Sequence, residues 1–255
     1  MTKELTGKTA LVTGGARGIG RGIAERLAAS GALVAVNYAS NVKAARDTVA
    51  AIEAKGGQAF AVHARIGESG AIETLVTALD KEFTQRTGKN GIDILINNIG
   101  GGEHASIETT TAELLHQTFS NNVYGPFLLT QALLPRLNNG GRVINISSAA
   151  SRLEGPTFIA YCMAKAAVEM FTRVLAKELG PRLITVNSVA PGYTASETNA
   201  DVMENAEVAR QIAEKTLFGR FGEIAEIADF VHALASPAGR WITYQNIEAS
   251  GGFDL

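Results

Sequence analysis

Short apolar runs alternate with longer segments of helical periodicity along the chain, and this alternation restricts the possible folds more than any other feature. The first run, Thr9-Ala-Leu-Val-Thr13, is too short for a helix and has the continuous apolar centre of a strand that is buried on both faces. The predicted strands cover residues 9–13, 33–37, 59–63, 92–96, 142–146, 183–189 and 242–249. The predicted helices cover residues 19–29, 44–55, 70–83, 111–137, 158–179 and 223–234.

Strands that alternate with helices predict right-handed βαβ crossovers and a doubly wound parallel sheet with helices on both faces. No linker, internal repeat or low-complexity tract divides the chain, so we expect one Rossmann-type α/β domain over residues 1–255. Residues 191–216 lack clear periodicity until Val208 and are expected to form a long loop with short helical pieces. The part from about 193 to 216 is a candidate lid over a substrate.

The overall composition excludes several functional classes. Apolar residues make up 46% of the chain, charged residues 19%, and the net charge is −2 without a basic cluster, so we expect no nucleic-acid or membrane partner. A single cysteine and a polar N-terminus without a signal peptide indicate a reducing cytoplasm. The four histidines lack metal-ligand spacing, and we predict no metal.

A glycine-rich loop, residues 13–20, joins the first predicted strand to the first predicted helix. Gly14, Gly18 and Gly20 leave the backbone bare where a pyrophosphate would approach a helix N-terminus. The spacing differs from G-x-G-x-x-G, and a plain tight turn is the alternative interpretation.

The end of the second predicted strand bears on the choice of nicotinamide cofactor. An acid there would bind a ribose 2′-hydroxyl, but residues 36–41 contain none. Arg17 could reach a 2′-phosphate, and Ser40 and Asn41 could donate to it. These residues favour NADP(H) over NAD(H), although Arg17 could also be a solvated loop charge.

Tyr161 and Lys165 are four residues apart on a predicted helix and therefore lie on one face, one turn apart. Ser148 follows an apolar strand and could be brought to the same point. Reduction of a carbonyl by hydride needs a proton, which Tyr161 could donate if its pKa of about 10 were lowered. Lys165 and an oxidised nicotinamide could lower it by about three units, which corresponds to about 4 kcal/mol. Ser148 would steady the developing alkoxide.

Together these motifs resemble those of the short-chain dehydrogenase/reductase family over residues 8–253. The glycine loop, Asn97-Asn98-Ile99-Gly100, Asn122-Val-Tyr-Gly125 and Pro191-Gly192-Tyr193-Thr194 match its motifs. The resemblance implies a seven-stranded sheet, a homotetramer, and Asn122, Ser148, Tyr161 and Lys165 as catalytic residues. The cofactor-binding residues that we predict are Gly14, Arg17, Gly18, Ile19, Gly20, Asn37, Tyr38, Ser40, Ile66, Asn98, Gly100, Tyr161, Lys165, Pro191, Gly192, Thr194 and Ser196.

Other positions are less clear. In this family the carbonyl of the catalytic Asn holds a water, and Pro126, which has no N–H, cannot bond the carbonyl of Asn122 within a helix. The family usually has an Asp that contacts adenine in the turn after the third strand. This chain has Ala64-Arg65-Ile66-Gly67 in that turn, and Arg65 either stacks on adenine or is exposed. His104 either lines the substrate mouth or is an ordinary loop residue.

These features predict an NADPH-dependent reductase of small ketones or ketoesters, reversible as an alcohol dehydrogenase. An NAD-dependent secondary alcohol dehydrogenase and a 3-oxoacyl-(acyl-carrier-protein) reductase are alternatives with the same chemistry. A dinucleotide-binding sensor without catalysis is an alternative of another class, and the presence of all four catalytic residue types argues against it.

Overall fold

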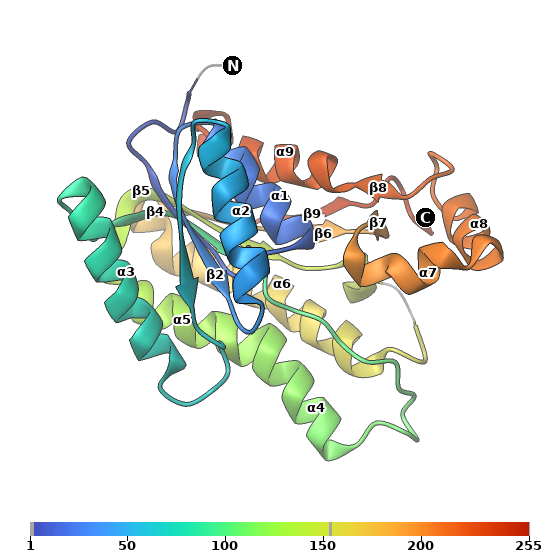
Figure 1. Ribbon diagram of the computed structural model, residues 1–255. Helices are drawn as coiled ribbons and strands as arrows, with labels where there is room; N and C mark the ends of the chain where they lie inside the picture. The colour runs from blue at the N-terminus through green and yellow to red at the C-terminus, as the bar shows by residue number, and fades with distance from the viewer. Residues whose placement is uncertain (1–2, 153–154, 255) are drawn as a thin grey trace.

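Seven parallel strands in the order β3-β2-β1-β4-β5-β6-β9 form the central sheet of the computed structural model, which describes residues 3–152 and 155–254 (Figure 1). The strands are β1 (Thr9–Val12), β2 (Leu33–Tyr38), β3 (Gln58–His63), β4 (Ile92–Asn97), β5 (Leu137–Ile146), β6 (Thr185–Pro191) and β9 (Asn246–Ala249). The predicted α/β class and the doubly wound parallel sheet are confirmed.

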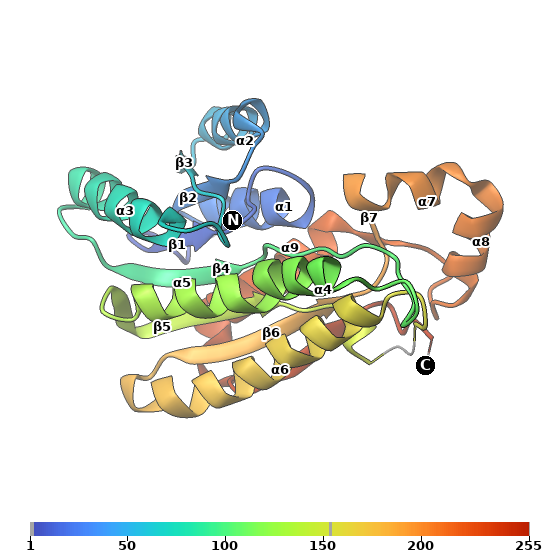
Figure 2. The ribbon, with the colours of Figure 1, turned by 90° about the horizontal axis from the view of Figure 1, so that it is seen from below.

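Helices cover both faces of the sheet. The bounds of the principal ones are α1 (Gly18–Ala29), α2 (Val42–Ala54), α3 (Ala71–Thr87), α4 (Ala112–Phe119), α5 (Gly125–Leu133), α6 (Ile159–Leu179) and α9 (Ile224–Ala235). Helices α1, α2 and α9 share one apolar core with the strands, while α3, α5 and α6 share the other (Figure 2). Because each strand is covered on both sides, its apolar run is continuous rather than alternating.

The strand order reverses between β1 and β4, since the chain winds outward from β1 to β3 and then returns to β4. In an open α/β sheet, ligands bind outside the carboxyl ends of the strands at this reversal. The glycine loop follows β1, residues 98–102 follow β4, and Ser148 follows β5. The topology therefore brings the predicted motifs together at the carboxyl ends of the strands.

The region expected to be one helix over residues 111–137 is divided. Helix α4 is followed by a π-helical turn, Ser120–Tyr124, and then by α5, which ends at Leu133. Residues 134–136 turn, and β5 already begins at Leu137, five residues before the predicted start of the strand at 142. Pairing with β4 explains this start, because Leu137 lies opposite Ile92, and the register then shifts before Arg142 meets Ile94.

The region that the sequence predicts to be irregular follows β6. A short strand β7 (Thr194–Ala195) pairs with β8 (Gly222–Glu223), and helices α7 (Ala200–Glu204) and α8 (Ala206–Glu214) lie between them in the chain. Neither helix has a buried residue, and both stand at one end of the sheet (Figure 2). The last strand is shorter than predicted and begins at Asn246, because the chain turns at Tyr244, whose φ is 68°.

Within residues 3–152 and 155–254, no helix combines the length and apolarity that crossing a membrane requires. The same residues contain no group of three or more His, Cys, Asp or Glu side chains arranged to hold a metal ion.

A buried row of polar side chains joins α5 to α6, which pack on the same face of the sheet, by way of β4 and β5. Asn97 Nδ2 on β4 donates to Thr130 Oγ1 on α5 at 3.1 Å and to Asn145 Oδ1 on β5 at 2.8 Å. Asn145 Nδ2 in turn donates to Thr172 Oγ1 on α6 at 2.8 Å. All four residues are at most 3% exposed, so their hydrogen bonds fix how the two helices sit on the sheet.

We expect Asn97→Ala to lower the free energy of unfolding by about 2–3 kcal/mol, because the substitution removes the donor for two buried acceptors. Thr130→Val keeps the shape but loses the acceptor for Asn97 Nδ2 and the donor to the Pro126 carbonyl, and should cost about 1 kcal/mol. Urea denaturation of the two variants beside the wild type measures both values. Equal and negligible losses would show that the row does not brace the helices.

Candidate active site

Lys165 lies at the centre of the candidate site and is only 2% exposed. It belongs to the buried face of α6, and its Nζ donates to the Ile146 carbonyl at the end of β5 at 2.9 Å. Burial lowers the pKa of Lys165 to about 8. The ammonium is therefore held at the sheet edge with a proton that it can release near neutral pH.

Tyr161 lies one turn before Lys165 on the same helix, and the Lys165 Nζ is 5.5 Å from the centroid of its ring. Burial raises the pKa of Tyr161, and a hydrogen bond with Ser148 opposes that rise. In the protein alone the net shift of the Tyr161 pKa is thus upward, not the lowering that the sequence predicts. Lys165 is itself desolvated and points at the Ile146 carbonyl, so it is not committed to the phenol.

Ser148 reaches Tyr161 because a short 3-10 helix, Ala149–Ser151, turns the chain directly after β5. Ser148 is the residue before this helix, and its Oγ accepts the Ala150 N–H at 3.2 Å. The hydroxyl can therefore donate its proton elsewhere while its oxygen is held by the backbone. Ser148, Tyr161 and Lys165 come together as the sequence predicts.

Asn122 lies in the π-helical turn and is 1% exposed. Its Nδ2 donates to the carbonyls of Gly101 and Thr118, both at 2.8 Å, and its Oδ1 accepts the Gly101 N–H at 3.2 Å. A Cβ on Gly100 would lie 2.7 Å from both Asn122 Oδ1 and Lys165 Nζ. Asn122 and Lys165 thus converge on the backbone of Gly100, where only glycine leaves room for both.

The glycine loop is shaped by Asn98, which lies beyond the end of β4. Asn98 Nδ2 donates to the carbonyls of Thr13 and Gly14 at 3.0 and 3.3 Å. A Cβ on Gly20 would approach the Gly14 carbonyl to 2.3 Å and Asn98 Nδ2 to 2.5 Å, so this contact requires glycine. The bare backbone at the start of α1 fits the pyrophosphate of a dinucleotide.

Two predicted cofactor residues turn out to be internal. Asn37 is fully buried, and its Nδ2 donates to the carbonyls of Val62 and Ala64 at 3.3 and 3.1 Å. Its Oδ1 accepts the Gly14 N–H at 3.4 Å, so Asn37 braces the glycine loop. Ile66 belongs to the apolar core shared by α3, α5 and α6, next to Gly125, at 3% exposure.

The residues beside them face outward. Arg17 precedes α1 and is exposed, as is Ser40 after β2, while Tyr38 is half-buried against His63. Arg65 is exposed and pairs with Glu68 at 3.1 Å. Arg17 and Ser40 are therefore available to a ligand at the carboxyl ends of β1 and β2.

The segment after β6 supplies the far wall of the site. Pro191 ends β6, and a Cβ on Gly192 would lie 2.8 Å from Ser250 Cβ. The buried Thr194 donates its hydroxyl to the Gly192 carbonyl at 3.2 Å, and Ser196 precedes a short 3-10 helix. This segment connects the sheet edge to α7 and α8.

A ring stack beside Tyr161 was not expected from the sequence. The Phe158 ring lies 4.6 Å from the Tyr161 ring, and His104 stacks on Phe158 with centroids 4.5 Å apart and planes 17° apart. An isolated bridge pairs Ala105 with Phe158. His104, for which a site position was one of two interpretations, thus stacks on the ring that contacts Tyr161, and its distance in sequence from residue 158 hid the pairing.

The arrangement suits proton transfer to an oxygen. A carbonyl oxygen placed between Ser148 and Tyr161 would meet two hydroxyls, and the Lys165 ammonium lies close behind the phenol.

Comparison with known proteins is consistent with this chemistry. A family model described as enoyl-(acyl carrier protein) reductase matches residues 14–254. A 3-oxoacyl-(acyl-carrier-protein) reductase of Synechocystis is 39% identical, covering 97% of each chain. The solved structure of the reductase LugOII has a TM-score of 0.95 and 47% sequence identity, and the match covers 99% of this chain and 100% of that one. LugOII is described as promiscuous and as catalysing keto-reduction at C1 in lugdunomycin biosynthesis. The angucycline C-6 ketoreductase LanV, solved with bound NADP, is 42% identical, with a TM-score of 0.96 and 100% and 98% covered.

The low pKa of Lys165 predicts a pH-dependent stability. Between about pH 8 and pH 10 the unfolded chain binds more protons at this residue than the folded chain, so the free energy of unfolding should rise with pH. Relative to Lys165→Met, the rise should approach about 3 kcal/mol across this window. The raised pKa of Tyr161 acts in the opposite direction only above pH 10.

Urea denaturation of both proteins at several pH values measures this difference. A wild-type minus Lys165→Met difference that stays constant from about pH 7 to pH 10 would contradict a lowered pKa.

Proposed function

Since the chain belongs to the short-chain dehydrogenase/reductase family, we propose that it is an NADPH-dependent carbonyl reductase that also oxidises the corresponding secondary alcohol. The observation that carries the proposal is the meeting of Ser148, Tyr161 and Lys165 at the sheet edge beside the glycine loop. A binding protein without catalysis would not need a buried ammonium behind a phenol, because burying a charge costs free energy.

NADPH, when bound, supplies the hydride that forms the new C–H bond. The remaining chemistry belongs to the chain. The Ser148 hydroxyl donates a hydrogen bond to the carbonyl oxygen, and Tyr161 Oη transfers its proton to that oxygen as it becomes an alkoxide. The ketone gains one hydride and one proton and becomes an alcohol. Lys165 stabilises the phenolate that remains.

Tyr161 then needs a new proton from solvent. Lys165 can pass one to it, and we propose that Asn122 maintains the route to Lys165. Pro126 follows the π-helical turn and lacks an N–H, which leaves the Asn122 carbonyl without that helical partner. The Asn122 side chain and Lys165 Nζ both lie beside Gly100, so Asn122 is close to the lysine that a water on its carbonyl would serve.

NADP(H) is the proposed cofactor, held by the bare backbone of Gly14, Gly18 and Gly20. Arg17 and Ser40 are exposed beside this loop, and residues 37–41 contain no acid that would repel a 2′-phosphate. LanV was solved with NADP bound, which supports the same choice here. An NAD-dependent alcohol dehydrogenase is the alternative.

The proposed substrates are small ketones or ketoesters. The two ketoreductases similar to this chain support keto reduction. A carrier-bound 3-oxoacyl chain is the second candidate, because the Synechocystis relative bears that activity in its name. The chain itself has no basic cluster that would suit an acidic carrier protein.

We also propose a cytoplasmic homotetramer. Large apolar side chains on the outer faces of α5, α6 and the π-helical turn are between 47% and 57% exposed, namely Tyr124, Phe127, Leu128, Met163, Met170 and Val174. A second copy would cover such a face. Light scattering of the purified protein tests this assembly, and a monomer at micromolar concentration would contradict it.

The activity is tested with a panel comprising ethyl acetoacetate, 1-tetralone and the N-acetylcysteamine thioester of acetoacetate. We expect NADPH absorbance to fall with at least one of the first two compounds, and faster than NADH absorbance. Reduction of the thioester alone would favour the carrier-bound substrate. Cofactor binding without turnover of any compound, in either direction, would favour the sensor.

Tyr161→Phe should lower kcat by at least about 10²-fold because the variant has no proton to donate, while NADPH binding should change little. Tyr244→Phe is the matched control, since Tyr244 lies at the start of the turn before β9 and contacts Lys177. Steady-state rates and NADPH fluorescence titration measure the two properties. Full turnover by Tyr161→Phe would remove the phenol from the mechanism.

Arg17→Glu should weaken NADPH binding by at least about tenfold and leave NADH binding nearly unchanged, because only NADPH carries the 2′-phosphate. Lys89→Glu makes the same charge change just before β4, at the opposite edge of the sheet, and should affect neither cofactor. Fluorescence titration of both variants decides the point. Equal weakening of NADPH and NADH by Arg17→Glu would show that Arg17 does not contact the 2′-phosphate.

A further inference from the structure

The segment 147–152 links β5 to the loop before α6 and contains Ser148 as its second residue. Its first residue, Ser147, is 2% exposed and donates its N–H to the Val189 carbonyl on β6 at 2.7 Å. The remaining residues form the 3-10 helix and the turn to Arg152. Ser148 is half-buried, so its position depends on how its two sides are held.

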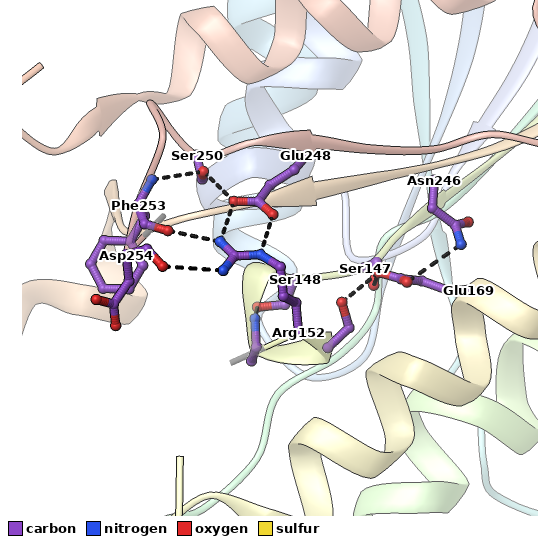
Figure 3. Close-up of polar contacts among 11 residues, drawn as sticks. Ser147, Ser148, Arg152, Glu169, Asn246, Glu248, Ser250, Phe253 and Asp254 are labelled. Carbon is purple, nitrogen blue, oxygen red and sulfur yellow. Dashed lines mark hydrogen bonds and ion pairs between the residues drawn. The ribbon is translucent and has the colours of Figure 1, made fainter. Parts of the chain in front are cut away.

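Glu169 accepts hydrogen bonds from this segment on both sides of Ser148, and Figure 3 shows Glu169 beside Ser147. Its Oε1 accepts a hydrogen bond from Ser147 Oγ at 3.1 Å and another from Ser151 Oγ at 2.5 Å. Ser147 precedes Ser148 directly, and Ser151 is the last residue of the 3-10 helix that Ser148 caps. One carboxylate oxygen thus fixes the residue before the hydroxyl and the turn after it.

The other carboxylate oxygen adds little to this function. Asn246 Nδ2 lies 3.4 Å from Oε2, but the Asn246 amide finds better hydrogen-bond partners when its oxygen and nitrogen exchange places. It then donates to Ser188 Oγ at 2.6 Å. The two hydroxyls on Oε1 are therefore the contacts that matter for the segment.

Glu169 lies on α6, one turn after Lys165 and two turns after Tyr161. Lys165 donates to the carbonyl of Ile146, the residue before Ser147. Helix α6, which carries Tyr161, therefore binds the end of β5 through Lys165 and the segment 147–152 through Glu169. Because Tyr161 and Glu169 share one rigid helix, the distance from the phenol to Ser148 is set by α6 itself.

Arg152 also fixes the segment 147–152, from the opposite side (Figure 3). It forms two hydrogen bonds with Glu248, both at 2.8 Å, and donates to the carbonyls of Phe253 and Asp254 at 2.7 and 3.3 Å. The Arg152 and Glu248 side chains are 37% and 27% exposed, so solvent weakens this pair. Arg152 is also four residues from Ser148 in sequence, whereas Ser147 is its direct neighbour.

We propose that Glu169 is a positioning residue for catalysis, which holds the Ser148 hydroxyl at the distance from Tyr161 that proton transfer needs. The proposal rests on the proposed reductase activity for its kinetic part only. A hydroxyl displaced by about 1 Å can lower a rate by about 10²-fold, so loss of the carboxylate should act on kcat. Glu169 contacts Ser147, which bonds to β6, whereas the glycine loop follows β1, two strands from β5, so NADPH binding should be unaffected.

The test compares Glu169→Ala and Glu169→Gln with Glu178→Gln, a matched control exposed on the same helix. With the best ketone of the panel, we expect Glu169→Ala to lower kcat by about 10- to 100-fold with an unchanged NADPH dissociation constant. Glu169→Gln keeps a neutral acceptor and should lose only a few-fold. Glu178→Gln should match the wild type. A Glu169→Ala kcat within twofold of the wild type would overturn the proposal.

A mutant cycle with Ser151→Ala separates positioning from general destabilisation. Ser151→Ala removes one of the two hydroxyls that bond to Oε1. Both substitutions disrupt the same contact, so adding Ser151→Ala to Glu169→Gln should lower kcat little further. The double variant should then be little slower than the slower single variant. If Glu169→Ala does not fold, this cycle still decides, and effects that multiply independently would contradict the proposal.

Amide hydrogen exchange gives a readout that needs no substrate. Peptides covering residues 147–152 should exchange faster in Glu169→Gln and Ser151→Ala than in the wild type, while peptides from β1 to β3 should not change. Faster exchange with an inactive wild type would mean that the reductase proposal fails and the bracing by Glu169 stands. Unchanged exchange together with unchanged kcat would mean that the bracing fails and the reductase proposal stands.

Discussion

The hydrogen bond from the Lys165 ammonium to the Ile146 carbonyl is the contact on which the site depends. A lysine that is 2% exposed loses nearly all of its hydration, and the pKa of about 8 reflects that cost. The carbonyl at the end of β5 compensates for part of it and so fixes α6 against the sheet edge. Tyr161, one turn away, is carried to the same edge. The bare backbone of Gly100 lets Asn122 approach from the other side.

The helix spacing and the glycine loop made much of this foreseeable. Tyr161 and Lys165 had to share a face because they are four residues apart, and both follow from local periodicity. The α/β class followed from alternating segments. The strand order, which brings the ends of β1, β4 and β5 together, is seen only in the structure. Local patterns also anticipated the helical pieces between residues 191 and 216, since a region without periodicity cannot be one long helix.

What could not be foreseen depends on contacts between distant residues. Asn37 ends a strand where a ribose-binding residue is expected, yet its side chain is buried between the glycine loop and β3. Glu169 resembles a half-exposed helix charge in sequence, and only the turn after β5 brings two serine hydroxyls to it. The π-helical turn around Asn122 has no local signature beyond Pro126, and β5 begins early because of its pairing with β4.

We propose that the protein alone keeps Tyr161 protonated and that a bound cationic nicotinamide would lower its pKa. Burial raises that pKa in the structure, while Lys165 is held by a carbonyl rather than by the phenol. Ultraviolet difference titration of the phenolate, wild type minus Tyr161→Phe, measures it directly with and without NADP⁺. We expect a Tyr161 pKa above about 10 in the free protein and a clear fall when NADP⁺ binds. A Tyr161 pKa that is already low in the free protein, or that NADP⁺ leaves unchanged, would contradict it.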